Sequence, residues 1–324
     1  MATRREILVG LGGLAGLAAL PSIARSGEAD LVRISGRAFG TRWQVTLPRD
    51  ADARALGADL RHILTGIYRS MSPFRADSEL SRFNRHRGTT SFPVSQEFHT
   101  VAARALDMAR LTDGAFDPGV GPAVHRYGFG PIDSGHAGPY TAFAAGTEGL
   151  SKADPALSLD LCGIAKGHAV DRLAGHMGAQ GVPCFLIEVG GEVYARGMRP
   201  NGVPWRVGIA DPAGSGIHSA LALRDMAMAT SGDAINAYEI AGRRYSHTID
   251  PATGEPVYNR VASVSVLAPT ALKADAFATA LMVMGPERGL AYASANGLPV
   301  LYLLREAGGL RAEANALFIE HGWS

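Results

Sequence analysis

The chain has few cysteines, and this limits what can hold it together. Only Cys162 and Cys184 occur among 324 residues, so a framework of disulfides is excluded. A single disulfide could join them, but Cys184 opens an apolar run and Cys162 lies in a glycine-containing turn. We therefore expect two separate, free, buried thiols. No Cys/His spacing typical of a zinc site occurs in the sequence.

An excess of charge of one sign is also absent. Lys and Arg number 31 against 30 Asp and Glu, which gives a net charge of +1, and aromatic residues make up 7% of the chain. No basic cluster interleaves with aromatic residues, so the sequence predicts no nucleic-acid partner. With 47% hydrophobic residues, the chain is long enough to bury one large core or two smaller ones.

Long hydrophobic runs are absent except near the start, at residues 7–20. This run is shorter than the roughly 20 residues that span a membrane, although a single membrane anchor remains the alternative. Arg4 and Arg5 precede the run and small residues end it, which predicts an export signal over residues 1–24, of the twin-arginine type. We expect residues 25–324 to form one integrated domain in the periplasm, without a transmembrane anchor in the mature form.

Glycine, in contrast, is plentiful at 40 residues, which favours many tight turns. Residues 131–155 lack any periodicity and predict either a long surface loop or an extra excursion of the chain. Helical spacing of apolar residues predicts helices at residues 52–71, 95–111, 164–180 and 270–285. Short apolar runs predict strands at residues 43–47, 185–189, 193–196, 205–209, 238–240, 262–267 and 300–304. Because helices and strands do not alternate regularly, we predict the α+β class, with mixed or antiparallel sheets and packed helices.

The last predicted helix, at residues 270–285, is apolar almost all the way round, which indicates a buried helix. Asp275 and Thr279 are four residues apart on it, so they share a face one turn from each other. Burial of a carboxylate is costly unless a hydrogen-bond donor or a cation meets it. Two interpretations stay open: an Asp that bonds a neighbouring loop, and a hard cation held by the carboxylate and the hydroxyl.

Three other polar, glycine-bearing segments are candidates for function. Residues 112–122 carry three glycines and two prolines, and they fit either a ligand-binding turn or a helix end and connector. Residues 160–168 place glycines and Lys166 at the start of a helix, which favours binding of a phosphate or carboxylate. In residues 245–254, His247 could act as a general base and Asp250 could orient it or the loop, although a lone His in a turn is more often structural. Together with the buried helix, these segments form a consistent set for phosphoryl chemistry.

The segments, taken in their order along the chain, resemble the ApbE-type FAD:protein FMN transferases. The resemblance spans about residues 33–285, nearly the whole predicted mature domain. It rests on the motifs Phe39-Gly-Thr41, Met71-Ser-Pro-Phe74, residues 77–84, Gly114-Ala-Phe-Asp-Pro118, Gly163-Ile-Ala-Lys-Gly167, Gly190-Gly191, Thr230-Ser-Gly232, residues 247–254 and residues 274–279.

The resemblance implies an enzyme that depends on Mg²⁺ and uses FAD as substrate. The FMN half of FAD is joined through a phosphodiester bond to a Thr or Ser hydroxyl of a client protein, and AMP leaves. The implied client is a flavoprotein subunit of a membrane electron-transfer complex. Two alternatives stay open: a FAD pyrophosphatase that releases FMN and AMP, and a non-catalytic periplasmic protein for flavin binding or assembly.

The resemblance also implies roles for particular residues. Asp275 and Thr279 supply metal oxygens, and Ala165 and Ala278 lie near the metal through their backbone carbonyls. His247 falls where the family has a histidine implicated in catalysis, with Asp250 close by in the same turn. Lys166 adds positive charge for the phosphates. Positions where the family contacts FAD hold Phe39, Phe74, Ala115, Phe116, Asp117, Cys162, His168 and Ile249.

Overall fold

The computed structural model describes residues 30–214, 216–234, 237–240 and 243–323. The predicted export signal, residues 1–24, lies outside them. No helix among the described residues is long and apolar enough to cross a membrane.

A single eight-stranded sheet forms the centre of the fold, with the order β1-β2-β5-β6-β9-β14-β15-β16. Every neighbouring pair in it is antiparallel. Its strands are β1 (Leu31–Ala38), β2 (Thr41–Pro48), β5 (Phe185–Val189), β6 (Glu192–Arg196), β9 (Met226–Gly232), β14 (Val261–Ala268), β15 (Val300–Glu306) and β16 (Gly309–Ala314). The predicted α+β class with antiparallel sheets is therefore confirmed.

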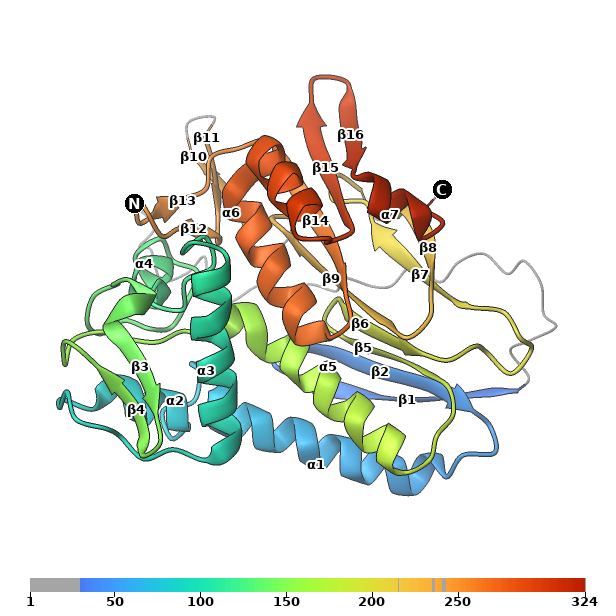
Figure 1. The fold of residues 1–324 in the computed structure, drawn as a ribbon, viewed down its shortest axis with the longest axis horizontal. Coiled ribbons are helices and arrows are strands. Elements are labelled where there is room, and N and C mark those ends of the chain that lie inside the picture. The colour runs from blue at the N-terminus through green and yellow to red at the C-terminus, as the bar shows by residue number, and fades with distance from the viewer. Residues whose placement is uncertain (1–29, 215, 235–236, 241–242, 324) are drawn as a thin grey trace, which may run out of the picture.

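The helices pack mainly on one face of this sheet, and four of them lie where helical spacing predicted a helix (Figure 1). Asp52, Ser95 and Thr270 accept hydrogen bonds from backbone N–H groups and so cap three of the helices. The helices are α1 (Ala53–Met71), α2 (Glu79–Arg85), α3 (Gln96–Leu111), α4 (Gly121–Arg126), α5 (Cys162–Ala179), α6 (Ala271–Ala295) and α7 (Ala316–Glu320), with a 3₁₀ turn at Tyr140–Ala142.

Helix α6 extends beyond the predicted end at Gly285. The backbone of Gly285 has φ 76° and ψ 176°, so the first helical segment does stop there, and Pro286 then opens a second segment that runs to Ala295. The helix start at Ile164 was predicted two residues too late, because α5 begins at Cys162.

The opposite face of the sheet is covered by the hairpin β7 (Trp205–Ala210) and β8 (Ile217–Leu223) together with α7. Trp205 and Leu221 of this hairpin pack with Phe318 of α7 and with sheet residues such as Met228. Apolar cores thus lie on both faces, which explains why all eight residues of β14 are buried.

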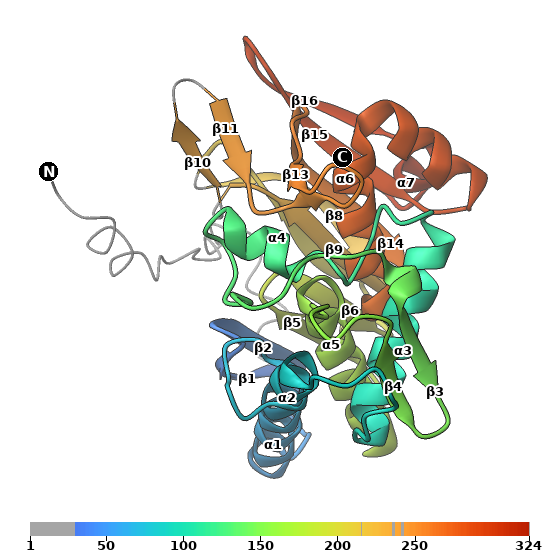
Figure 2. The same ribbon diagram turned by 90° about the vertical axis from the view of Figure 1, so that its left-hand side faces the viewer.

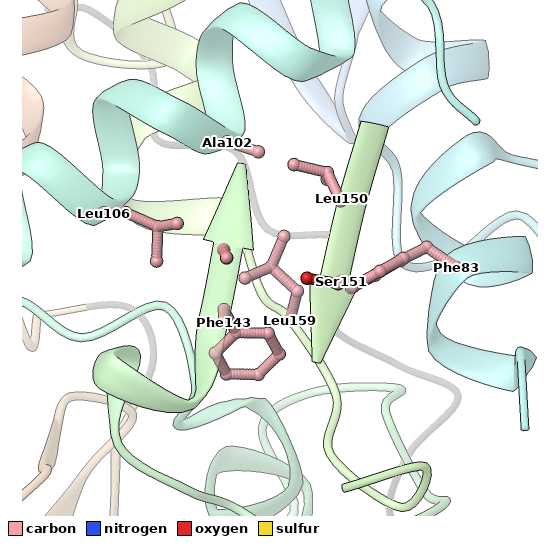
Figure 3. A pocket seen from close by; sticks show the side chains of 8 residues that line it. Phe83, Ala102, Leu106, Phe143, Leu150, Ser151 and Leu159 are labelled. Carbon is pink, nitrogen blue, oxygen red and sulfur yellow. The ribbon is translucent and has the colours of Figure 1, made fainter. Parts of the chain in front are cut away.

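Of the two alternatives predicted for residues 131–155, the plain surface loop is wrong. Residues 131–155 are not a plain surface loop, since they contain the hairpin β3 (Phe143–Gly146) and β4 (Gly149–Lys152). Strands of four residues are too short to show a period in the sequence. The hairpin packs on α3, and Figure 3 shows the small apolar void between them. The void has no room for a water molecule, so it is a packing defect rather than a ligand site.

Two further hairpins and α4 lie together at one end of the molecule (Figure 2). They are β10 (Ala237–Ile240) with β11 (Arg243–Ser246), and β12 (Ile249–Asp250) with β13 (Glu255–Pro256). The predicted turn at residues 241–242 lies outside the described residues, whereas the one at Gly190-Gly191 is confirmed between β5 and β6.

Both cysteines are free, as predicted. Cys184 is buried, but Cys162 is exposed because it starts α5 at the surface, so the prediction of a buried thiol was wrong for Cys162.

Candidate active site

Two glycines of α5 allow it to lie against α6, and this contact builds the candidate site. A Cβ on Gly167 would come within 2.3 Å of the Ala271 carbonyl oxygen. A Cβ on Gly163, one turn earlier, would lie 3.0 Å from Oγ1 of Thr279 and 3.1 Å from the ring of Phe116. The glycines predicted to approach a ligand therefore also bring Thr279 and Phe116 to the start of α5.

Asp275 meets α5 one turn from Thr279. It is 4% exposed, and its Oδ2 accepts a hydrogen bond of 2.9 Å from the backbone N–H of Gly167. Burial raises the pKa of Asp275, while the positive charge of Lys166 and the Gly167 N–H act in the opposite direction. The predicted shared face of Asp275 and Thr279 is thus directed at α5.

A second buried carboxylate lies beside them. Glu192, at the start of β6, is 2% exposed and its Oε1 accepts a hydrogen bond from Nζ of Lys166. Its other oxygen, Oε2, is buried and has no hydrogen-bond partner among the residues that the structure describes. Burial raises the pKa of Glu192 to about 7, although Lys166 opposes this. Glu192 was not predicted as a site residue. The sequence feature that could have identified it is a carboxylate directly after Gly190-Gly191, at the start of an apolar strand.

Lys166 joins the two carboxylates electrostatically. Burial by itself would lower its pKa, but the negative charges of Glu192 and Asp275 outweigh this effect and raise it above its ordinary value. One ammonium group therefore faces two carboxylates. We call Gly163, Lys166, Asp275, Thr279 and Glu192 the α5–α6 site.

The α5–α6 site has the donors that a hard cation prefers. A carboxylate and a hydroxyl share one face of α6, and the buried Oε2 of Glu192 lacks a partner. Among the described residues, no group of three His, Cys, Asp or Glu side chains gathers to hold a metal. Ala165 lies next to Lys166, and the fully buried Ala278 lies next to Thr279. That the backbone carbonyl oxygens of Ala165 and Ala278 bind the metal stays a prediction.

The predicted anion site at the start of α5 is partly filled by the protein itself. Oδ1 of Asp160 accepts a hydrogen bond of 2.8 Å from the backbone N–H of Cys162. Leu161, the residue before the helix, makes no side-chain cap. The carboxylate of Asp160 therefore lies at this helix end, and binding of a phosphate or carboxylate ligand there stays a prediction.

The segment 112–122 is a rigid loop beside α5. Asp117 is 9% exposed, and its two oxygens accept hydrogen bonds from the N–H groups of Gly119 and Tyr140 at 2.8 and 2.9 Å. Burial raises its pKa, while these two hydrogen bonds oppose the shift. The carboxylate of Asp117 thus stabilises the conformation of this loop through two hydrogen bonds. Ala115 and Phe116 before it are buried, and their contacts with FAD stay a prediction.

Phe39 lies in the turn between β1 and β2, and Phe74 follows the end of α1. Phe39 occupies the β1–β2 turn with φ 53°, and its ring meets Tyr68 edge-on with centroids 6.0 Å apart. Phe74 is 68% exposed, which leaves its ring face available. A hollow of about 370 Å³ lies between the turn and α1, lined by Arg37, Phe39, Gly40, Trp43, Arg61 and Tyr68 among others.

His247 lies in the turn between β11 and β12. Its ring meets Phe129 with centroids 6.2 Å apart. Asp160 N donates to Pro118 O at 2.6 Å, and Gly121, which starts α4, lies against the side chain of Asp160. The chain from residue 118 to residue 129 thus links the start of α5 to His247.

Asp250 is occupied by its own turn. Its Oδ1 accepts a hydrogen bond of 2.9 Å from Ala252 N–H, and its carbonyl oxygen accepts one of 2.8 Å from Gly254 N–H. Of the two roles predicted for it, these contacts match the one of ordering the loop. Ile249 before it is 3% exposed in β12.

The structure does not bring His168 together with Lys166. Two residues along a helix are about 200° apart around its axis, so the two side chains leave α5 on nearly opposite sides. Nε2 of His168 lies 3.0 Å from Oε1 of Glu97 on α3. Burial lowers the pKa of His168, while Glu97 opposes the shift. Contacts of His168 and Cys162 with FAD stay predictions.

Comparison with known proteins identifies the class of this arrangement. The chain superimposes on a flavin transferase ApbE from Vibrio cholerae with a TM-score of 0.80 and 37% identity, over 90% of this chain and 99% of that one. It superimposes on the apo flavinyl transferase ApbE of Pseudomonas stutzeri with a TM-score of 0.82 and 33% identity, over 90% of this chain and 96% of that one. The fold is thus that of the ApbE flavin transferases.

Sequence comparison agrees with the structural one. A model of the ApbE family matches residues 39–302. The FAD:protein FMN transferase of V. cholerae is 41% identical over 308 residues, which cover 90% of this chain and 92% of that protein. The one from Haemophilus influenzae is 33% identical over 325 residues, covering 93% and 94%. The chain belongs to the ApbE family, which confirms the resemblance.

Proposed function

We propose that this protein transfers the FMN half of FAD to a hydroxyl group of a second protein. The support is the α5–α6 site, where Asp275, Thr279 and Lys166 converge, in a chain that shares its family with proteins named FAD:protein FMN transferase. In the proposed reaction, a Thr or Ser oxygen of the acceptor attacks the phosphorus of the FMN moiety. The bond to the bridging pyrophosphate oxygen breaks, AMP leaves, and a phosphodiester forms.

The chain's own residues have distinct parts in this proposal. His247 takes the proton of the acceptor hydroxyl as that oxygen attacks. Asp275 and Thr279 would hold Mg²⁺, with Lys166 and Glu192 setting the charge around it. Bound Mg²⁺ would neutralise charge that develops on the phosphate oxygens. Glu192 restrains the ammonium group of Lys166, so that it is oriented before substrate arrives.

Location and client are part of the proposal too. The leader with Arg4 and Arg5 favours export to the periplasm, and the proposed acceptor is a flavoprotein subunit of a membrane electron-transfer complex.

Intact mass measurement tests the reaction. The full chain is incubated with FAD, Mg²⁺ and an acceptor protein that presents a Thr or Ser. Transfer predicts that the acceptor gains the mass of one FMN less one water. Release of free FMN and AMP with an unmodified acceptor would identify a pyrophosphatase instead. FAD that binds but stays whole would identify a flavin-binding protein.

A further inference from the structure

Exposed apolar side chains occur on the two segments that flank His247 in the chain. Ile240 and Tyr258 are 60% and 76% exposed, and Tyr238 is 36% exposed. Tyr238 and Ile240 are two residues apart on β10 and therefore share one face of the strand. Val257 N donates to Thr248 O at 2.9 Å, so Tyr258 lies beside the turn that carries His247. We call Tyr238, Ile240 and Tyr258 the hairpin surface.

A ladder of rings connects the hairpin surface to His247. Phe129 stacks on Tyr238 and Tyr238 stacks on Tyr245, each with centroids 5.2 Å apart. The phenol of Tyr238 donates a hydrogen bond of 3.1 Å to the carbonyl of Tyr127. Since the ring of His247 meets Phe129 at the start of this ladder, the hairpin surface is continuous with the catalytic histidine.

Ion pairs to a buried carboxylate tie β11 to the central sheet. Asp233, 4% exposed, accepts a hydrogen bond of 2.7 Å from Nε of Arg244 on β11, and it also pairs with Arg305 on β15. Arg126 of α4 donates to the carbonyl of Gly254 at 3.3 Å. These contacts tie β11 to the central sheet and the following turn to α4.

The hairpin also offers strand edges. Among the described residues, β10 and β11 pair only with each other, and Figure 2 shows them at the rim of the molecule above α4. An unpaired strand edge with exposed apolar side chains is a template on which an extended chain can add as a further strand.

We propose that the hairpin surface binds an extended segment of the acceptor protein, with the acceptor hydroxyl placed at His247. The inference rests on the proposed function, because transfer requires a second polypeptide to reach this histidine. The segment adds along the hairpin edge and lays apolar side chains against Ile240 and Tyr258. The main-chain hydrogen bonds give affinity, and the apolar contacts select the segment.

Steady-state kinetics of the full chain test this assignment. Ile240→Ser and Tyr258→Ser, alone and together, remove exposed apolar surface without touching the core. The double variant should raise the KM for the acceptor protein by about tenfold or more. The kcat at saturating acceptor and the Kd for FAD, read from flavin fluorescence, should stay at the wild-type values. Ile319→Ser is the matched control, since Ile319 is 52% exposed on α7, at a distant part of the molecule (Figure 1).

Three results would overturn the assignment. An unchanged KM for the acceptor in the double variant, with transfer intact, would show that the hairpin surface does not bind the acceptor. The proposed function would then still stand. A wild-type protein that transfers no FMN to any acceptor would remove the function and this inference with it. A dimer that dissociates in the double variant, with an unchanged acceptor KM, would show that the surface joins two copies of the chain.

Discussion

At the scale of single residues, the proposed function assigns a part in the reaction to one buried carboxylate. Asp275 already has one hydrogen bond from Gly167 and remains next to a lysine and a second carboxylate. A purely structural Asp would be fully occupied by backbone donors, as Asp171 is by the N–H groups of Ala271 and Leu272 at 2.7 and 2.9 Å.

Asp275→Asn tests this difference. The amide oxygen can still accept from Gly167, so the fold should be retained, but the charge that would hold Mg²⁺ is gone. We expect FMN transfer at fixed Mg²⁺ to fall by about 100-fold or more, since a bound divalent ion contributes several kcal/mol to such reactions. Transfer rates over a Mg²⁺ titration, with circular dichroism as the check on folding, measure it. Wild-type rates in this variant would contradict the metal assignment.

His247 is the second residue with a separable role. In His247→Asn the site can still bind FAD, but no group takes the acceptor proton, so kcat should fall by about 10²–10⁴-fold. Single-turnover transfer and FAD affinity, measured side by side, distinguish loss of chemistry from loss of binding. An unchanged rate with an unchanged pH profile would remove His247 from the role of base.

Lys152 lies outside the α5–α6 site, and its burial predicts how the free energy of unfolding changes with pH. It is 2% exposed, and its Nζ donates to the carbonyls of Asn84 and Leu157 at 3.0 and 2.9 Å. Burial lowers its pKa from 10.5 to about 8. Between these two pH values the unfolded chain holds more protons than the folded one, so stability contributed by this group rises with pH.

The matching measurement compares the wild type with Lys152→Met, whose side chain does not titrate. From pH 8 to 10.5, the difference in free energy of unfolding should move in favour of the wild type, as read from urea denaturation. The exposed Lys273, replaced in the same way, is the control. A difference that stays flat over this range would refute the account of Lys152.

At the scale of elements, the contact between α5 and α6 determines the site. Gly167→Ala would place a methyl group 2.3 Å from the Ala271 carbonyl oxygen. We expect a loss of about 1–3 kcal/mol of stability, with lower transfer activity because Asp275 is bonded to the same residue. Gly175→Ala on the same helix is the control. A Cβ added to Gly175 would meet no atom of the described residues within 4 Å, apart from its chain neighbours and the backbone of its own helix. That change should stabilise the helix by about 0.5–1 kcal/mol. Equal effects of the two substitutions on thermal unfolding would contradict this account.

Much of this element-level structure was predictable, for physical reasons that differ between elements. Helices α1, α3 and α5 bury one face, so their apolar residues repeat at helical spacing and their ends match prediction within two residues. The hairpins β3–β4 and β12–β13 were missed because strands of two to four residues carry no period. Glu192 could not be paired with Lys166 in advance, since 26 residues of chain separate them and only the sheet brings them together.

At the scale of the whole molecule, the site draws on residues far apart in sequence. The central sheet carries Glu192, and two packed helices carry Lys166, Asp275 and Thr279. Asp275 and Thr279 could be paired from spacing alone because they lie on one helix. The proximity of Phe116 to Gly163 required the fold.

The predicted export signal gives a prediction at this scale. Replacing Arg4 and Arg5 by lysine keeps the charge but removes the arginine pair that the twin-arginine route requires. Fractionation of cells should then find the protein in the cytoplasm rather than the periplasm. Unchanged periplasmic recovery would argue for a different export route.

The central claim is that the α5–α6 site drives transfer of FMN to a protein rather than hydrolysis of FAD. The most direct measurement counts the AMP released and the flavin covalently bound to acceptor in the same reaction, with Mg²⁺ and with a chelator. The account predicts one AMP for each bound FMN, with both products lost on chelation and in Asp275→Asn. AMP release in large excess over bound flavin, or equal yields in the variant, would contradict it.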